Sequence, residues 1–321
     1  MKIAVVVPCY KVKASICDVL HRIGPEVQAI YVVDDKCPQG TGDYVEANCT
    51  DARVVVLRHE SNRGVGGAVV SGYCRALEDG ADIVAKIDGD GQMDPALLPR
   101  LLQPILTGRA DYTKGNRFAA RYQMLNRTQR HMPLLRLLGN SVLSFLHKAV
   151  SGYWNIMDPT NGYCVIHRHA LESINLRELA QGYFFENDML FQLNLINAVV
   201  KDVPIPARYG DEESHLKVRQ VLLAFPPLMI HRFCKRIVFK YFINDFNVAS
   251  LEMLIGLPLI VAGATYGGYR WILGIQQGLE NTAGTVMVSA LPIILGFQLL
   301  LSVVSYDINN VPKTPLSGEA V

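Results

Sequence analysis

Residues 83–92 read I-V-A-K-I-D-G-D-G-Q, and the interpretation of the chain starts there. A short apolar run, typical of a buried strand, leads into Asp88, Asp90 and Gln92 at alternate positions. An extended backbone points such side chains to the same side. Two carboxylates and one amide oxygen suit a hard cation, Mg²⁺ or Mn²⁺, that shares its coordination sphere with phosphate oxygens. The alternative is an Asp-Gly turn with solvated carboxylates.

Short β-branched runs alternate with helical segments over the first 115 residues. The runs cover residues 3–7, 29–33, 54–57 and 83–87. This βαβ rhythm predicts an α/β fold with a mostly parallel sheet that helices cover on both faces. Ligands of such sheets bind beyond the carboxyl ends of the strands. A second acidic pair, Asp34 and Asp35, follows the second run, and it strengthens the expectation of a nucleotide bound with a metal.

The composition is that of a folded protein of about two domains. Of the 321 residues, 50% are hydrophobic and 19% are charged, which excludes a disordered chain. The net charge of +2 gives no reason to expect nucleic acid as a partner. The seven cysteines are odd in number and include no C-x-x-C pair, so we expect neither a disulfide framework nor a zinc site.

Two uncharged segments near the C-terminus, residues 253–269 and 281–306, predict a transmembrane hairpin. A bilayer core needs about 20 apolar residues in a helix. The turn between the segments has a single cation, Arg270, whereas four cations precede the first segment: Arg232, Lys235, Arg236 and Lys240. The positive-inside rule then places the N-terminal domain and the C-terminal tail in the cytoplasm. A buried pair of soluble helices is the alternative.

We expect four parts along the chain: a nucleotide-binding domain (1–217), interfacial amphipathic helices (218–245), two transmembrane helices (246–307) and a cytoplasmic tail (308–321). Apolar residues mix with cations between 218 and 244, as in helices that lie in a membrane interface. The prolines at 226 and 227 predict a break there. Too few apolar residues precede Pro8 for a signal peptide, so we expect the globular part to stay in the cytosol.

Five motifs in register resemble glycosyltransferase family 2 enzymes of GT-A fold. They are P-C-Y-K at 8–11, V-D-D at 33–35, N-R-G-V-G-G-A at 62–68, D-G-D-G-Q at 88–92 and G-N-R-F at 115–118. The two C-terminal spans make the closest resemblance that to the polyprenyl-phosphate glycosyltransferases, which include the dolichyl-phosphate mannose synthases. The resemblance implies a GT-A-type nucleotide-sugar-binding domain, followed by interfacial helices and a two-helix transmembrane hairpin.

The same resemblance implies which residues bind the base and ribose of the donor. Pro8 and Tyr10 match the loop that packs on the base. Asp34 and Asp35 match the acidic pair that hydrogen-bonds base and ribose. The alternatives are a proline that ends a strand and a half-buried tyrosine.

The diphosphate of the donor has its own implied contacts. Asp88, Asp90 and Gln92 match the motif that binds the metal on the diphosphate. Arg117 matches a planar cation that binds a phosphate at two points, and a solvated arginine is the alternative. Arg208 is a further candidate cation, although three acidic residues interrupt the family's loop pattern after it.

A basic segment contains the candidate residues for contact with the acceptor. Arg136 and Asn140 stand four residues apart, so they share a helix face. The resemblance implies that they contact the acceptor lipid phosphate, with Arg127 and Arg130 nearby. The alternative is a basic helix that lies against anionic headgroups.

Glu186 and Asp188 occupy the place of the family's acidic motif and are candidates for a general base; Asp90 and Arg208 complete the candidate catalytic set. A hydroxyl acceptor loses a proton as it attacks, so a base contributes strongly. A phosphate monoester is already anionic, so positioning and electrostatics matter more. Asp188 would then orient and tune the site. Two acids in a first helical turn can also simply complement the helix dipole.

We therefore expect a membrane-bound, metal-dependent enzyme that transfers a sugar, with inversion, from a nucleotide-sugar donor to a polyprenyl phosphate at the cytoplasmic leaflet. Its partners would be the donor, the lipid and the bilayer, and G-x-x-x-G at Gly263 and Gly267 would allow close helix packing and a homo-oligomer. The alternatives are transfer to a hydroxyl of a lipid-diphosphate-linked saccharide or another acceptor, and a noncatalytic membrane scaffold. A dinucleotide dehydrogenase is disfavoured because residues 8–11 lack the required glycines. The residues do not specify the sugar, the nucleotide or the lipid length.

Overall fold

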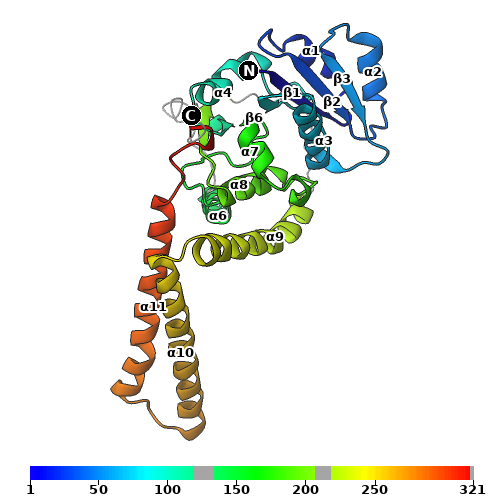
Figure 1. The fold of residues 1–321 in the computed structure, drawn as a ribbon. Helices are drawn as coiled ribbons and strands as arrows, with labels where there is room; N and C mark the ends of the chain where they lie inside the picture. Colours follow the sequence, from blue (N-terminus) through cyan, green and yellow to red (C-terminus); the bar gives the residue numbers. More distant parts are fainter. Residues whose placement is uncertain (119–133, 207–217, 319–321) are drawn as a thin grey trace. The chain divides into compact units, whose positions relative to one another are not determined.

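A seven-stranded sheet with the order β3-β2-β1-β4-β6-β5-β7 organises the N-terminal part of the chain (Figure 1). The computed structural model describes residues 1–118, 134–206 and 218–318. The strands are β1 (Ile3–Cys9), β2 (Ala29–Asp34), β3 (Val54–Arg58), β4 (Ile83–Lys86), β5 (Tyr112–Asn116), β6 (Cys164–His167) and β7 (Val200–Pro204). All neighbouring strands are parallel except that β6 runs antiparallel to β4 and β5. The predicted α/β fold with a mostly parallel sheet is confirmed.

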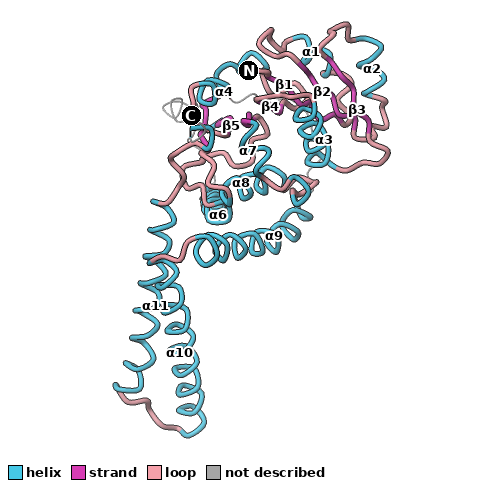
Figure 2. Tube along the Cα trace, in the orientation of Figure 1, coloured by secondary structure: helices cyan, strands magenta, loops and turns pink. Residues whose placement is uncertain are grey.

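Helices cover both faces of this sheet, as Figure 2 shows. One core contains residues of α3 (Gly64–Glu78), α7 (Arg168–Ser173) and α8 (Phe185–Leu195). The other contains residues of α1 (Ile16–His21), α2 (Thr41–Asn48) and α4 (Leu98–Leu106). The remaining elements of the described sheet region are α6 (Leu134–Ser151) and two short 3-10 helices, η1 (Pro95–Leu97) and η2 (Leu176–Glu178). Asp94 caps η1, so a 3-10 turn precedes α4.

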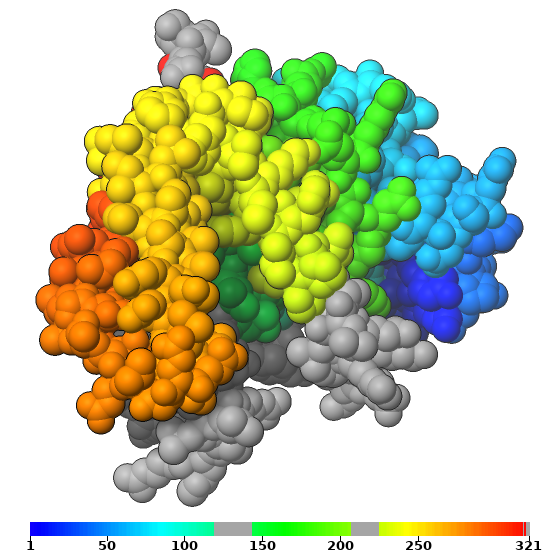
Figure 3. Space-filling model, turned by 90° about the horizontal axis from the view of Figure 1, so that it is seen from below, coloured from blue at the N-terminus to red at the C-terminus, as the bar shows by residue number. Residues whose placement is uncertain are grey.

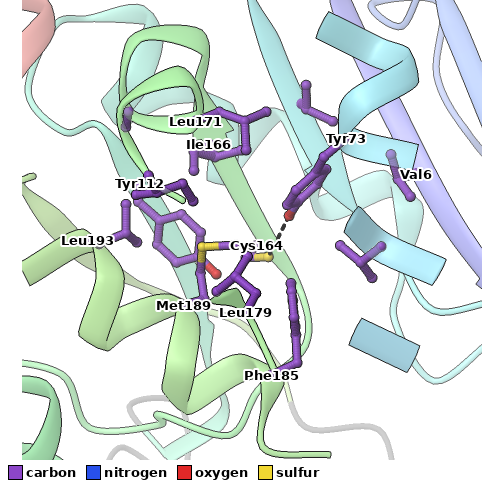
Figure 4. Packing of buried hydrophobic residues seen from close by; sticks show 14 of the residues in the cluster. Val6, Tyr73, Tyr112, Cys164, Ile166, Leu171, Leu179, Phe185, Met189 and Leu193 are labelled. Atoms are coloured by element: carbon purple, nitrogen blue, oxygen red, sulfur yellow. Dashed lines mark hydrogen bonds between the residues drawn. The ribbon is translucent and has the colours of Figure 1, made fainter. Parts of the chain in front are cut away.

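The core under α8 fixes how that helix is rotated. Cys164 of β6 lies between Tyr73 and Tyr112, with the Tyr73 hydroxyl 3.8 Å from its sulfur (Figure 4). Phe185 and Met189, four residues apart on α8, point into this cluster. Their burial leaves the polar residues between them on the flanks of the helix. All seven cysteines are free thiols, as their spacing predicts.

The structure divides into two compact units, Met1–Phe233 with Val311–Val321, and Cys234–Asn310. The second unit contains a π-helical turn, η3 (Phe239–Asn244), and two long helices, α10 (Val248–Gln277) and α11 (Ala283–Asn309). Both long helices are apolar enough and long enough to cross a membrane. The two segments predicted as spans therefore form helices of the required kind.

Glycines bring the backbones of α10 and α11 together. A Cβ atom at Gly263 would lie 2.6 Å from the Ser289 carbonyl oxygen, and one at Gly296 would lie 2.5 Å from the Gly256 carbonyl oxygen. Side chains at these positions would force the helices apart. The close packing predicted for Gly263 is thus used inside the hairpin, while a homo-oligomer stays a prediction.

The helix that precedes the hairpin, α9 (Val218–Val238), contains Pro226 and Pro227 in its interior. The predicted break at these prolines is therefore wrong. Each proline removes one backbone hydrogen bond, but Phe225 and Met229, on either side of them, pack into a cluster with Val150. Apolar packing of the flanking turns offsets the missing hydrogen bonds.

After α11 the chain returns to the first unit. The Leu316 backbone N–H, at the start of η4 (Leu316–Gly318), donates to Asp111 Oδ2 at 3.0 Å. Val311 and Leu316 pack against the core that contains α7. The chain therefore enters the second unit from the first and returns to the first after it.

Candidate active site

Asp88 to Gln92 form a turn beyond the carboxyl end of β4. The strand ends at Lys86, Gly91 adopts φ +79°, and Asp90 Oδ1 accepts a hydrogen bond from the Gln92 backbone N–H at 2.9 Å. The extended backbone that we predicted for this stretch is therefore wrong, because Gly91 turns the chain and the Asp90 carboxylate binds the turn's own backbone. The turn still brings three oxygen-bearing side chains to the edge of the sheet where ligands bind.

Lys86 links this turn to α8. The side chain is 1% exposed, and its Nζ lies 2.9 Å from Asp88 Oδ1 and 3.2 Å from Glu186 Oε1. Burial lowers the pKa of the Lys86 ammonium, but the carboxylates of Asp88 and Glu186 outweigh burial, so the net pKa is raised. A Cβ atom at Gly162 would lie 2.4 Å from Lys86 Nζ and 2.8 Å from Asp88 Oδ2. A side chain at this position would require the Lys86–Asp88 ion pair to shift.

The two acids of α8 lie on different flanks of the helix. Two residues span about 200° of an α-helix, so Glu186 and Asp188 point apart. Glu186 reaches Lys86 beside the carboxylate turn and is 14% exposed. Asp188 is fully buried, pairs with Arg232 of α9 at 2.7 Å and accepts the Ala180 backbone N–H at 2.8 Å. Of the two predicted bases, Glu186 is the one that adjoins Asp88.

Arg117 follows β5 and is fixed by a buried acid. Its Nε lies 2.8 Å from Asp158 Oδ2 and its Nη2 donates to Asp158 Oδ1 at 3.0 Å. The Arg117 side chain remains 37% exposed, whereas Asp158 is fully buried. Arg117 lines one pocket together with Gln92 and Asn161. The predicted diphosphate cation and one predicted metal ligand thus face the same cavity.

Pro8, Tyr10, Asp34 and Asp35 lie at the adjoining carboxyl ends of β1 and β2. The register pairs Pro8 with Val33, and the Asp35 backbone N–H donates to the carbonyl of Cys9. Pro8 is buried and the Tyr10 ring is 45% exposed. The structure therefore brings the four predicted base and ribose residues together, and the contacts to a nucleotide stay a prediction.

Both acids of this group bind backbone amides. Asp34 is 7% exposed and accepts from the Gly42 N–H at 2.6 Å. Asp35 is 3% exposed and accepts from the Arg63 and Gly64 N–H groups, each at 2.7 Å. His59 Nδ1 also lies 2.7 Å from Asp35 Oδ1. Asp35 therefore binds the glycine-rich 62–68 motif to the end of β2.

Some predicted residues fall outside the described structure. Arg136 and Asn140 lie on α6, four residues apart as predicted, but their side chains are outside the described residues. Arg127, Arg130 and Arg208 lie wholly outside them. The predicted acceptor contacts and the Arg208 contact to the diphosphate stay predictions.

Two buried lysines are functional candidates that the sequence reasoning missed. Lys86 of β4 and Lys114 of β5 both lie opposite Cys164 of β6, so all three share one face of the sheet. Lys114 is fully buried, which lowers the pKa of its ammonium, and it donates to the carbonyl of Asn161 in the pocket wall. A lysine inside the apolar run 83–87 is the signal that could have found Lys86, because it requires a buried partner, whereas the strand Y-T-K-G-N of β5 gives no such signal for Lys114.

The side chains at the turn fit a divalent cation shared with a ligand. Asp88, Asp90 and Gln92 offer oxygen donors only, which Mg²⁺ and Mn²⁺ prefer. Within residues 1–118, 134–206 and 218–318, no group of three or more His, Cys, Asp or Glu side chains could enclose a metal. A set of two carboxylates and one amide leaves coordination positions for phosphate oxygens, unlike a closed structural site.

The comparisons with known proteins agree with this geometry. Residues 4–174 match the model of the family described as glycosyl transferase family 2. Over 209 residues the chain is 32% identical to undecaprenyl-phosphate mannosyltransferase of Micrococcus luteus, which covers 64% of this chain and 83% of that protein. Over 215 residues it is 30% identical to polyprenol monophosphomannose synthase of Mycolicibacterium smegmatis, with coverage of 65% and 77%.

Among solved structures, glucosyl-3-phosphoglycerate synthase from Mycobacterium tuberculosis is similar, in a complex with Mn²⁺, UDP and glucosyl-3-phosphoglycerate. The TM-score is 0.51 and the identity 21%, over 73% of this chain and 79% of that one. This likeness concerns the fold, and it confirms the predicted GT-A-type architecture. The chain thus belongs to glycosyl transferase family 2.

Proposed function

We propose that this glycosyltransferase moves a sugar from a nucleotide-sugar donor to a polyprenyl phosphate at the cytoplasmic face of a membrane. The reaction would depend on Mg²⁺ or Mn²⁺ and would invert the anomeric carbon. Two bacterial relatives are named undecaprenyl-phosphate mannosyltransferase and polyprenol monophosphomannose synthase, and these names support a polyprenyl phosphate acceptor.

The observation that carries the proposal is the shared pocket of Gln92 and Arg117 at the carboxyl edge of the sheet. Gln92 belongs to the turn that carries Asp88 and Asp90, and Arg117 is a guanidinium fixed by Asp158; carboxylates for a metal and a cation for phosphate are the charges that a metal-bound diphosphate requires. The chain also carries two helices long and apolar enough to cross a bilayer. An enzyme so anchored meets a lipid acceptor by diffusion in two dimensions.

The transfer would be a single displacement. An oxygen of the lipid phosphate forms a bond to the anomeric carbon while the bond from that carbon to the nucleoside diphosphate breaks, and the diphosphate leaves with the electron pair. When bound, the divalent cation would supply positive charge against the charge on the departing diphosphate. Arg117 would bind a phosphate oxygen from the opposite side of the pocket.

The ion pairing of Glu186 supports a phosphate acceptor, which needs no general base. Lys86 carries a positive charge between Asp88 and Glu186, so Glu186 is already engaged in an ion pair, as is the pocket residue Asp94 with Arg22. A phosphate nucleophile is anionic near pH 7 and needs no base. Glu186 would then act mainly by placing Lys86 and Asp88.

The test uses membranes that contain the full chain, Mn²⁺, radiolabelled GDP-mannose or UDP-N-acetylglucosamine, and added polyprenyl phosphate. We expect a labelled lipid that releases its sugar in mild acid, because a sugar linked to a single phosphate hydrolyses readily. Chelation of the metal should abolish the product, and NMR of the product should show inversion at the anomeric carbon. A labelled lipid that resists mild acid would instead indicate a hydroxyl acceptor.

A further inference from the structure

Arg232 of α9 makes a buried ion pair with Asp188 of α8. Its Nε lies 2.7 Å from Asp188 Oδ1, and its Nη2 donates to Asp188 Oδ2 at 2.9 Å and to the Glu178 carbonyl at 3.0 Å. The guanidinium also lies over the Phe191 ring, 5.1 Å from its centroid. The Arg232 side chain is 14% exposed and that of Asp188 is 0% exposed, so removal of either charge would leave the other buried without this ion pair.

Asp188 in turn fixes the segment that precedes α8. Its Oδ2 accepts the Ala180 backbone N–H at 2.8 Å. The next carbonyl, that of Gln181, accepts the N–H groups of Gly66 and Gly67 at 2.7 and 3.2 Å. A Cβ atom at Gly66 would lie 2.2 Å from the Ala180 carbonyl oxygen. The 180–182 segment therefore contacts the first turn of α3 backbone to backbone, at a distance that only glycine allows.

The first turn of α3 is bound from its other side by Asp35. Arg63 and Gly64 donate their backbone N–H groups to the two Asp35 oxygens. Asp35 lies at the end of β2, in the group of residues that we predict to bind the nucleotide. The glycine-rich 62–68 motif thus stands between the nucleotide site and the segment that Asp188 and Arg232 fix.

Apolar side chains of α9, in addition to Arg232, pack next to α8. Met229 of α9 shares a buried cluster with Phe184 and Val150, and the Phe225 ring meets Phe184 edge to face at 5.2 Å. In Figure 3 the yellow-green residues of α9 lie directly on green residues of the first unit. The Arg232–Asp188 ion pair therefore adds to an apolar cluster that packs α9 beside α8.

We propose that Arg232 and Asp188 are positioning residues for the nucleotide-sugar donor. The ion pair fixes the 180–182 segment against the N-terminus of α3. Through α3 it also fixes the loop whose backbone N–H groups bind Asp35. This requires the contacts of α9 with α8 described above. Asp188 acts through Ala180 and Arg232 and not on the reacting atoms. This inference rests on the proposed function in one respect, namely that a nucleotide sugar occupies the Asp35 side of the site.

The test compares Arg232→Met and Arg232→Lys in the full chain, purified in lipid nanodiscs. The donor is whichever of GDP-mannose and UDP-N-acetylglucosamine the unaltered chain uses with Mn²⁺. We expect Arg232→Met to raise the donor KM about tenfold while kcat changes less than about threefold, the pattern of lost ground-state positioning. Arg232→Lys keeps the charge but has one nitrogen and cannot bind Asp188 and Glu178 as a fork, so we expect an increase of about threefold.

Amide hydrogen exchange and a control variant test the proposal further. Amide hydrogen exchange at residues 64–67 should accelerate in Arg232→Met, although Arg232 contacts none of them. Arg168→Met is the matched control, because its ion pair with Glu172 is on the surface, with side chains 34% and 43% exposed, and it should change neither value. Should Arg232→Met fail to fold, Arg232→Lys carries both measurements.

The outcomes separate this inference from the proposed function. An unchanged donor KM with unchanged exchange at 64–67 overturns the positioning role, and so does a large loss of kcat alone. Calorimetric binding of UDP and GDP with Mn²⁺ requires no acceptor. If nucleotide affinity depends on Arg232 but no sugar reaches polyprenyl phosphate, the positioning role stands and the proposed acceptor is wrong.

Discussion

Each of the two units contains a buried cation paired with carboxylates, and the two clusters differ in one respect. In the first unit, Lys86 is 1% exposed, yet its partners Asp88 and Glu186 are 28% and 14% exposed. In the second unit, Arg236 and Asp307 are 0% and 5% exposed. The first cluster leaves its acids accessible to a ligand, whereas the second is closed on all sides.

The closed cluster satisfies its charges internally. Arg236 donates to both Asp307 oxygens, at 2.7 and 2.9 Å, and the Tyr241 hydroxyl donates to the same carboxylate. This network joins the start of the second unit to the end of α11. The comparison teaches that burial of a charge does not by itself mark a ligand site; accessible oxygens on the paired acids do.

The largest effect should come from the accessible acids. We expect Asp90→Asn to reduce sugar transfer on the order of a thousandfold, since it removes a charge that we propose to bind the metal on the donor diphosphate. The melting temperature should change little, because Asp90 is only partly buried. Asp18→Asn, at a side chain that is 73% exposed on α1, is the control and should retain full activity. Equal activity of the two variants would remove the metal from the account.

Substitutions in the closed cluster should lower the stability of the protein and leave its kcat nearly unchanged. Arg236→Met leaves the Asp307 carboxylate buried without its cation, and we expect a loss of about 3–5 kcal/mol of stability. Thermal unfolding in nanodiscs measures it, and Arg236→Met with Asp307→Leu should recover most of the loss. The kcat per folded molecule should change less than about threefold. A stable Arg236→Met variant that has lost its activity would contradict the distinction between the clusters.

The same substitution in the open cluster should affect catalysis. Lys86→Met removes the cation that orients Asp88 and Glu186, and we expect kcat to fall about 10- to 100-fold, as for residues that orient metal ligands. Because the carboxylates raise the pKa of Lys86 above its ordinary value, the group stays charged from pH 6 to 9, and the pH profile of the unaltered enzyme should show no step from Lys86. Full activity of Lys86→Met would remove it from the site.

The smallest effect should come from Glu186→Gln, which keeps the side-chain shape and an oxygen for Lys86. With a phosphate acceptor we expect kcat to fall less than about tenfold, because no proton has to be removed. A loss of a hundredfold or more, together with a shifted pH profile, would identify Glu186 as a general base and favour the hydroxyl acceptor. Steady-state kinetics with saturating donor and polyprenyl phosphate decides between these results.

Local sequence pattern predicted most of the sheet. The runs at 3–7, 29–33 and 54–57 are strands within two residues of their predicted ends, because β-branched residues and following turn residues mark strands locally. β6 and β7 were not predicted, and the place of β6 between β4 and β5 depends on antiparallel pairing with strands far away in sequence. Long-range pairing leaves no local periodicity.

The sequence predicted which residue types lie at the candidate site but not where their side chains point. The motif at 88–92 predicted oxygen-bearing side chains beyond β4, and their role as metal ligands stays a prediction, while the turn made by Gly91 could not be read from alternate spacing alone. Glu186 and Asp188 were equivalent in the sequence. Their separation follows from the burial of Phe185 and Met189, which sets the rotation of α8, and from Arg232, a partner 44 residues further along the chain.

The most direct test of the central claim is anomalous X-ray diffraction from crystals of the full chain grown with Mn²⁺ and the nucleoside diphosphate that the protein binds. We predict a manganese peak bounded by the side chains of Asp88, Asp90 and Gln92, with diphosphate oxygens completing its coordination and Arg117 on the diphosphate. A bound nucleotide with manganese elsewhere, or with no manganese at all, would contradict it.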